Sequence, residues 1–156
     1  MLNTLSQAEE HIDLRGSVRI LQSDPIIVVE TKSIPDVIRG LHWAPYERMI
    51  NVVQGAIFDV VIDTRLGSQT FGQVQKQAIK AEFNLQVHVP AGCLHGFYSF
   101  DHSTVIYTKM GVYEPECERR YKYHKDSFGV EWPSIGDREY IMSEDDKNAW
   151  RVWVSR

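Results

Sequence analysis

The feature that most constrains the fold is a succession of short β-forming runs separated by turn residues. In one of them, AIFDVVID, Phe58, Val60 and Ile62 occupy alternate positions, while Asp59 and Asp63 belong to the other set. A period of two predicts a strand with one buried face. We therefore expect the apolar set in the core and the two aspartates on a polar face.

Further runs have the same character. Val87 and Val89 alternate with polar residues before a proline, and residues 26–30 and 104–109 are rich in β-branched side chains. Helical signals are weak until MSEDDKNAWRVW, where Ser143 precedes acidic residues as a helix cap does. Many strands and one short C-terminal helical segment predict an all-β sandwich or barrel, between which the pattern alone does not choose.

Length and charge restrict the function. A chain of 156 residues fits one domain spanning residues 1–156. A net charge of −4 argues against a nucleic-acid partner but not against a small anion held by local arginines. The start shows no secretory pattern and the longest aliphatic run is four residues, so we expect no membrane partner. With only two cysteines, a reducing, cytoplasmic location is the default.

Two histidines lie beside glycines, in VIRGLHW and VPAGCLHGF. The P-x-G-x-x-H pattern that ends at His95 resembles the second signature of cupin jelly rolls. A metal-binding cupin also needs an earlier H-x-H and a carboxylate. Here the residue two positions after His42 is Ala44, and Arg48 occupies the region where an anionic ligand is needed. The sequence therefore predicts no metal.

Acid–base chemistry is the alternative. A free imidazole has a pKa of about 6.5 and accepts protons near neutral pH. Removing a proton next to a carbonyl also needs positive charge where the enolate forms, which Arg39 or Arg48 could supply. Read singly, other residues have ordinary explanations: Asp146 could complete a capping box begun by Ser143, and Tyr107 could simply pack its ring.

Taken in order, the motifs resemble one family. VIRGLHW, VVQGAIFDVVIDTR, SQTFG, VPAGCLHGF, VIYTKMGVYEPECER, FGVEWP and MSEDD are similar to segments of the dTDP-4-dehydrorhamnose 3,5-epimerases, over about residues 37–146. The resemblance implies a cupin jelly roll, a homodimer and neither metal nor cofactor. It also implies inversion of centres beside the keto group of a nucleotide-linked 4-keto-6-deoxy sugar.

The resemblance assigns roles to three residues as the catalytic set. His42 would be the general base, Asp146 would orient and charge it, and Tyr107 would be the acid on the opposite face of the sugar. It also implies substrate contacts, among which Arg15 resembles a phosphate contact that reaches in from the neighbouring subunit. The other implied contacts are Arg39, His95 and Glu118.

Three departures bear on the substrate. Arg48 stands where the family places a lysine that steadies the enolate, and arginine and lysine are not interchangeable. Asp145 replaces the lysine expected before the catalytic aspartate. Ile20 falls where a glutamate that reads thymine is expected. The nucleotide, the sugar and the number of centres inverted therefore stay open.

Other functions remain compatible with the sequence. A 3,4-ketoisomerase would use similar groups to move the carbonyl rather than invert a carbon. A metal-dependent cupin, such as a dioxygenase, is a more distant alternative. A non-catalytic module that binds sugar nucleotides would keep the fold without the chemistry.

Overall fold

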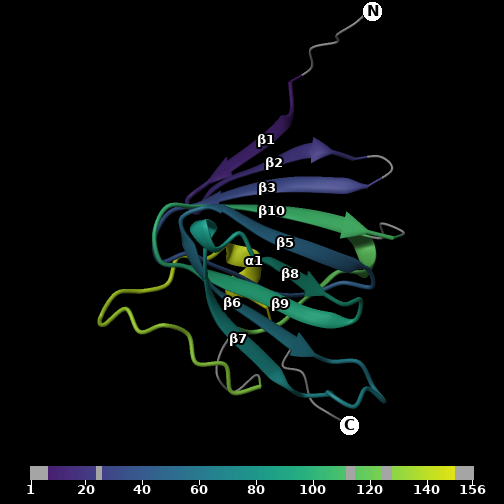
Figure 1. Ribbon diagram of the computed structural model, residues 1–156. Helices are drawn as coiled ribbons and strands as arrows, with labels where there is room; N and C mark the ends of the chain where they lie inside the picture. Colours follow the sequence, from purple (N-terminus) through teal and green to yellow (C-terminus); the bar gives the residue numbers. More distant parts are fainter. Residues whose placement is uncertain (1–6, 24–25, 112–114, 124–127, 150–156) are drawn as a thin grey trace, which may run out of the picture.

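The computed structural model describes residues 7–23, 26–111, 115–123 and 128–149. Two antiparallel sheets face one another (Figure 1). The first has the order β1 (Glu9–Asp13), β2 (Gly16–Gln22), β3 (Ile27–Ser33), β10 (Ser103–Met110), β5 (Glu47–Gln54), β8 (Gln86–Val89). The second has the order β11 (Arg119–Arg120), β4 (Ile38–Trp43), β9 (Cys93–Ser99), β6 (Ala56–Asp63), β7 (Val74–Lys80).

Helical structure is sparse in the described residues. It consists of two 3-10 turns, η1 (Ala81–Phe83) and η2 (Pro115–Cys117), and the helix α1 (Glu144–Lys147). Ser143 caps α1, because its hydroxyl accepts a hydrogen bond from the backbone N–H of Asp146 at 3.1 Å. The predicted all-β class with a short C-terminal helix is therefore confirmed, although the end of the predicted helical segment, residues 150–153, lies outside the described residues.

The interior between the sheets is filled by alternate residues of both. On β5, Ile50 and Val52 point inward, and Val105 of β10 and Phe97 of β9 join them in one buried cluster. Burying such side chains contributes roughly 1.5–3 kcal/mol each. This cluster closes one part of the sandwich and leaves the inward faces of β4, β5, β9 and β10 to line a cavity elsewhere.

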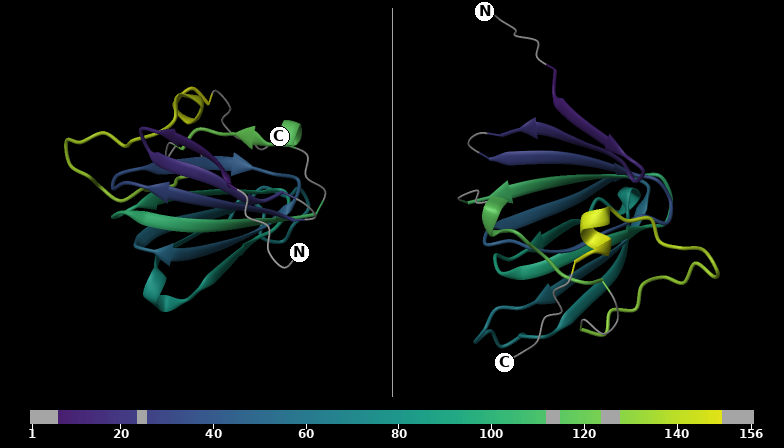
Figure 2. Two further views of the ribbon diagram at one scale, coloured as in Figure 1. Left: turned by 90° about the horizontal axis from the view of Figure 1, so that it is seen from above. Right: turned by 180° about the vertical axis from the view of Figure 1, so that it is seen from behind.

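The expectation of a single buried face on β6 is wrong. Val60 and Ile62 pack against Val130 of the C-terminal segment. Figure 2 shows this segment running behind the second sheet. The opposite face of the strand looks into the sandwich, so Asp59 is fully buried rather than solvated. Alternation in the sequence distinguished the two faces, but it could not reveal that a later segment covers the outer one.

No helix in the described ranges combines the length and apolarity needed to cross a membrane.

Candidate active site

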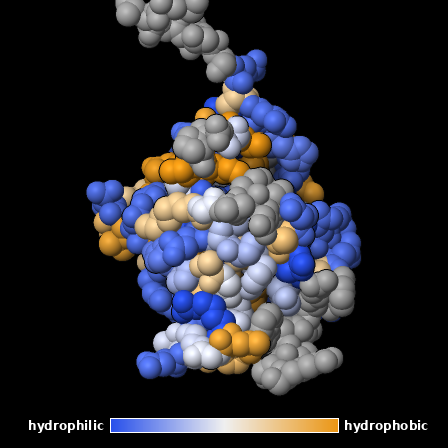
Figure 3. Space-filling view, turned by 90° about the vertical axis from the view of Figure 1, so that its right-hand side faces the viewer, coloured by the Kyte–Doolittle hydropathy of each residue, from blue (hydrophilic) through white to orange (hydrophobic). Residues whose placement is uncertain are grey.

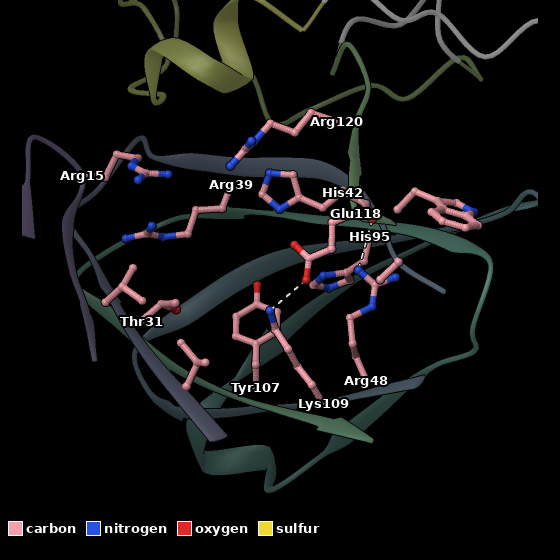
Figure 4. Close-up of a pocket in the computed structure, with 14 residues that line it drawn as sticks. Arg15, Thr31, Arg39, His42, Arg48, His95, Tyr107, Lys109, Glu118 and Arg120 are labelled. Atoms are coloured by element: carbon pink, nitrogen blue, oxygen red, sulfur yellow. Dashed lines mark hydrogen bonds and ion pairs between the residues drawn. The ribbon is translucent and has the colours of Figure 1, made fainter. Parts of the chain in front are cut away.

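A cavity of about 270 Å³ lies between the two sheets. Figure 4 shows polar side chains converging on it from both walls. The second sheet and its continuation contribute Arg39, His42, His95, Glu118 and Arg120. The first sheet contributes Thr31, Arg48, Tyr107 and Lys109, and Arg15 comes from the turn between β1 and β2.

The glycines beside the two histidines bring their strands together. Gly40 has φ of 135°, and a Cβ on it would lie 2.7 Å from Cα of Gly96. Only glycine tolerates both that backbone conformation and that approach. The register between β4 and β9 then pairs His42 with His95, so both imidazoles lie on the cavity wall.

His42 is bonded to a carboxylate from the far end of the chain. Its Nε2 lies 2.8 Å from Oδ1 of Asp146, whose side chain is 1% exposed. Burial alone would raise the pKa of Asp146, but His42, the backbone N–H of Gly40 and Arg120 together lower the pKa below the ordinary value. The carboxylate thus stays charged and accepts a hydrogen bond from Nε2. In the neutral imidazole, the tautomer that makes this bond leaves the lone pair on Nδ1.

Tyr107 lies on the opposite wall, on β10. Its ring meets His95 edge to face, with centroids 5.8 Å apart, and it also contacts Phe97. Burial raises the pKa of Tyr107 above its usual range, an effect that the nearby Arg39 opposes. The phenol is therefore protonated at neutral pH and has a proton to give.

His95 is held by a buried acid. Its Nε2 lies 2.7 Å from Oδ1 of Asp59, and the two side chains are 3% and 0% exposed. This bond fixes the orientation of the imidazole whose ring supports Tyr107. Asp59 therefore helps to position His95, a residue of the cavity wall, without lining the cavity itself.

Two guanidinium groups lie at one side of the cavity, as Figure 4 shows. Arg39 is 6% exposed and donates to the hydroxyl of Ser33 at 2.9 Å and to the carbonyl of Lys32 at 3.0 Å. Burial, followed by the charge of Arg15, lowers the pKa of Arg39 to about 10. Arg15 is oriented by Asp13, whose oxygens lie 3.0 and 3.1 Å from its Nε. Arg15 and Arg39 thus place two guanidinium groups on one side of the cavity, an arrangement that suits an anion.

Three further charged groups line the cavity: Arg48, Lys109 and Glu118. Arg48 is 4% exposed, and burial lowers its pKa to about 10. It donates to the carbonyl oxygens of His42 at 3.1 Å and Cys93 at 2.8 Å. Lys109 lies beside it, with Nζ 3.0 Å from Oε1 of Glu118. Burial raises the pKa of Glu118.

All the residues singled out from the sequence as site residues line this cavity, except Asp146, which acts on it through His42. Arg15 lines the cavity of its own chain, whereas the resemblance implied a reach from a neighbour. Sequence reasoning missed Asp59, Arg120 and the position of Lys109. The two-residue spacing from Tyr107 would have revealed Lys109, because residues i and i+2 of a strand share a face.

Among the residues that the structure describes, no group of three or more His, Cys, Asp or Glu side chains is positioned to hold a metal ion.

Comparison with known proteins identifies the family. A family model described as dTDP-4-dehydrorhamnose 3,5-epimerase matches residues 13–152. A protein of that name from Sinorhizobium fredii is 34% identical over 116 residues, which cover 71% of this chain and 58% of the relative. The chain belongs to the dTDP-4-dehydrorhamnose 3,5-epimerase family.

Solved structures agree with this membership and with the predicted cupin-type fold. The dTDP-4-dehydrorhamnose 3,5-epimerase of Elizabethkingia anophelis superposes with a TM-score of 0.72 at 27% identity, covering 92% of this chain and 87% of that one. A 3'-monoepimerase from Streptomyces bikiniensis, in complex with dTDP-quinovose, gives 0.69 at 29% identity, covering 92% and 80%. This member of the epimerase family nevertheless spans only 58% of the length of the Sinorhizobium relative.

Proposed function

We propose that this protein is a metal-independent epimerase of a nucleotide-linked 4-keto-6-deoxy sugar, acting at C3, at C5 or at both. The observation that carries the proposal is the His42–Asp146 pair on one wall of the cavity and Tyr107 on the other. Inversion at carbon needs a base and an acid on opposite faces of the substrate, and these two walls supply them.

The reaction begins at a C–H bond next to the C4 ketone. Nδ1 of His42 takes the proton, the electron pair of that bond forms the C=C bond of an enolate, and the negative charge moves to the C4 oxygen. Asp146 stabilises the imidazolium that results. Tyr107 then gives its phenolic proton to the other face of the same carbon, the C=C bond becomes a C–H bond, and the ketone is restored.

The other predicted residues would bind the substrate. Arg15 and Arg39 suit the diphosphate of a sugar nucleotide, because adjacent guanidinium groups bind phosphate oxygens well. Arg48, His95 and Glu118 would contact the sugar or fix its surroundings. The proposed mechanism requires no metal and no cofactor.

We also propose that the chain, as one cupin domain of residues 1–156, forms a homodimer. β1 is the edge strand of its sheet, and unpaired strand edges are prone to pair with another chain. Ile12 of this strand and Leu14 just after it are 71% and 59% exposed. Figure 3 shows further apolar side chains gathered where β2 and β3 meet. A molar mass of one chain by light scattering would contradict the dimer.

A cytoplasmic location is a further proposal. It is supported by Cys93 and Cys117, which are not joined to each other in a disulfide, and by the class of substrate.

The decisive experiment is proton exchange with solvent. The protein is incubated in D2O with dTDP-4-keto-6-deoxyglucose, and with the UDP, GDP and CDP counterparts, while NMR follows the C3 and C5 protons. Deuterium entering C3 alone or both positions, and not in His42→Ala, supports the epimerase and names the centres. Movement of the carbonyl would reveal a 3,4-ketoisomerase. Binding without exchange would reveal a non-catalytic binding protein.

A further inference from the structure

The enolate in this reaction needs a cation at its oxygen. Arg48 is held by two backbone hydrogen bonds, which restrict its movement toward that oxygen. Both terminal nitrogens of its guanidinium donate to backbone carbonyls, those of His42 and Cys93. These bonds tie β5 to β4 and β9, so Arg48 holds the cavity floor together. A group used in this way contributes positive charge to the site but cannot move without disturbing the strand that carries His42.

Lys109 is better placed than Arg48 to reach a substrate oxygen. It follows Tyr107 by two residues on β10 and therefore shares its face, and it is the cross-strand partner of Arg48. Figure 4 shows its side chain rising beside that of Tyr107 into the cavity. Its Nζ lies 3.0 Å from Oε1 of Glu118 and 5.6 Å from the centroid of the Tyr46 ring, so the ammonium is held in place.

We propose that Lys109 is the catalytic cation that binds the C4 carbonyl oxygen of the keto sugar and carries the charge of the enolate. This inference rests on the epimerase function proposed above. When His42 removes the proton, the C–H pair forms the C=C bond and the π pair of the carbonyl moves onto the oxygen, which accepts a hydrogen bond from the ammonium. When Tyr107 gives a proton to carbon, the C=C π pair forms the new C–H bond, the oxygen pair restores the carbonyl, and the ammonium is unchanged.

The surroundings of Lys109 fit this task. An ammonium has three N–H donors, so it can keep Glu118 and still donate to a substrate oxygen. Burial, followed by the charge of Arg48, lowers the pKa of Lys109 to about 8. Desolvation of this kind is what makes a fixed charge strongly stabilise another charge that develops in the transition state. Arg48 would thus act behind Lys109 as a positioning residue.

The test compares Lys109→Met with wild type in the same D2O exchange assay. Loss of one donor that stabilises an oxyanion costs about 10²–10³-fold in rate, and we expect that loss here. Binding of dTDP alone, measured by calorimetry, should change by less than about threefold, because dTDP has no ketone. Lys76→Met removes the same charge from the exposed face of β7 and should exchange at the wild-type rate.

Further variants keep the proposal open to refutation. Lys109→Met leaves the carboxylate of Glu118 without this cation, so the double variant with Glu118→Gln is measured beside it as a neutral pair. Lys109→Arg retains the charge and should keep more activity than either. Exchange at the wild-type rate by either Met variant, or loss of dTDP binding in step with exchange, would overturn the role of Lys109. Absence of exchange in wild type would instead overturn the epimerase function itself.

Discussion

His42 and Asp146 are 104 residues apart in the chain, yet their side chains meet at 2.8 Å. The contact forms because α1 is capped by Ser143 and lies against β4, which lets the first turn of the helix present its aspartate to the strand. Gly40, two residues before His42, donates its backbone N–H to the same carboxylate at 3.4 Å. The base of the proposed reaction is thus assembled from two distant parts of the chain, β4 and the C-terminal helix α1.

Asp146→Asn should lower the rate of solvent exchange by between about 10²- and 10⁴-fold, the range in which positioned acid–base groups contribute. The amide keeps the shape of the carboxylate but cannot stabilise an imidazolium, and it can present its NH₂ group to His42 and so favour the wrong tautomer. The control is Glu144→Gln, an exposed acid of the same helix, which should retain the wild-type rate. Equal rates for Asp146→Asn and wild type would show that His42 does not depend on this acid.

Much of this site was predictable from the sequence because its residues lie in motifs whose order is preserved. His42, His95 and Tyr107 each follow a turn or occupy a strand whose position the alternation and glycines indicate. Asp146 is different, because a capping box was an equally good local explanation. Half of that explanation holds, since Ser143 does cap the helix, while the carboxylate of Asp146 turns to His42 instead.

Other parts of the structure had no local signal. Asp59 was expected on a polar surface because strand periodicity says nothing about which segment covers a sheet from outside. The C-terminal segment covers the outer face of β6, and Asp59, on the face that looks into the sandwich, pairs with His95, 36 residues away. Arg120 belongs to a two-residue strand, β11, that forms only because β4 is there to pair with it.

Gly40→Ala should destabilise the protein and also slow exchange, because two separate problems arise at one site. The φ of 135° is strained for any L side chain at a cost of about 1–3 kcal/mol, and the new methyl would meet Gly96 at 2.7 Å. Gly67→Ala is the matched control, since Gly67 has φ of 84° but no atom near its Cβ position within 4 Å. Urea unfolding should show a clearly larger loss for Gly40→Ala, and similar losses would mean that the close approach of β4 and β9 contributes nothing.

Asp59→Ala should cost about 3–5 kcal/mol in the free energy of unfolding, the typical result of breaking a buried pair. His95 would be left buried without its acceptor at 2.7 Å, next to a new cavity. The chain contains a matched exposed pair, in which Nε2 of His88 lies 3.2 Å from Glu47 and both side chains are about half exposed. Glu47→Ala should therefore cost no more than about 1 kcal/mol, and equal costs would contradict the difference in burial.

Asp63 makes the stability of the protein depend on acid pH. Its carboxylate accepts from Arg65 at 2.8 Å, from Ser68 at 2.6 Å and from Thr70 at 2.5 Å. These bonds, that of Arg65 first, hold the pKa of Asp63 well below its usual range. The unfolded state therefore binds a proton more readily, so the stabilisation is complete above the unfolded pKa of about 3.9 and is lost as the pH falls below it.

Asp63→Asn removes this titration while keeping the size of the side chain. The variant should be less stable than wild type at pH 7, and its stability should fall less steeply between about pH 4 and pH 2, so that the two curves approach each other in acid. Chemical unfolding at a series of pH values measures both effects. Parallel curves over that range would mean that the bonds from Arg65, Ser68 and Thr70 do not favour the charged form of Asp63.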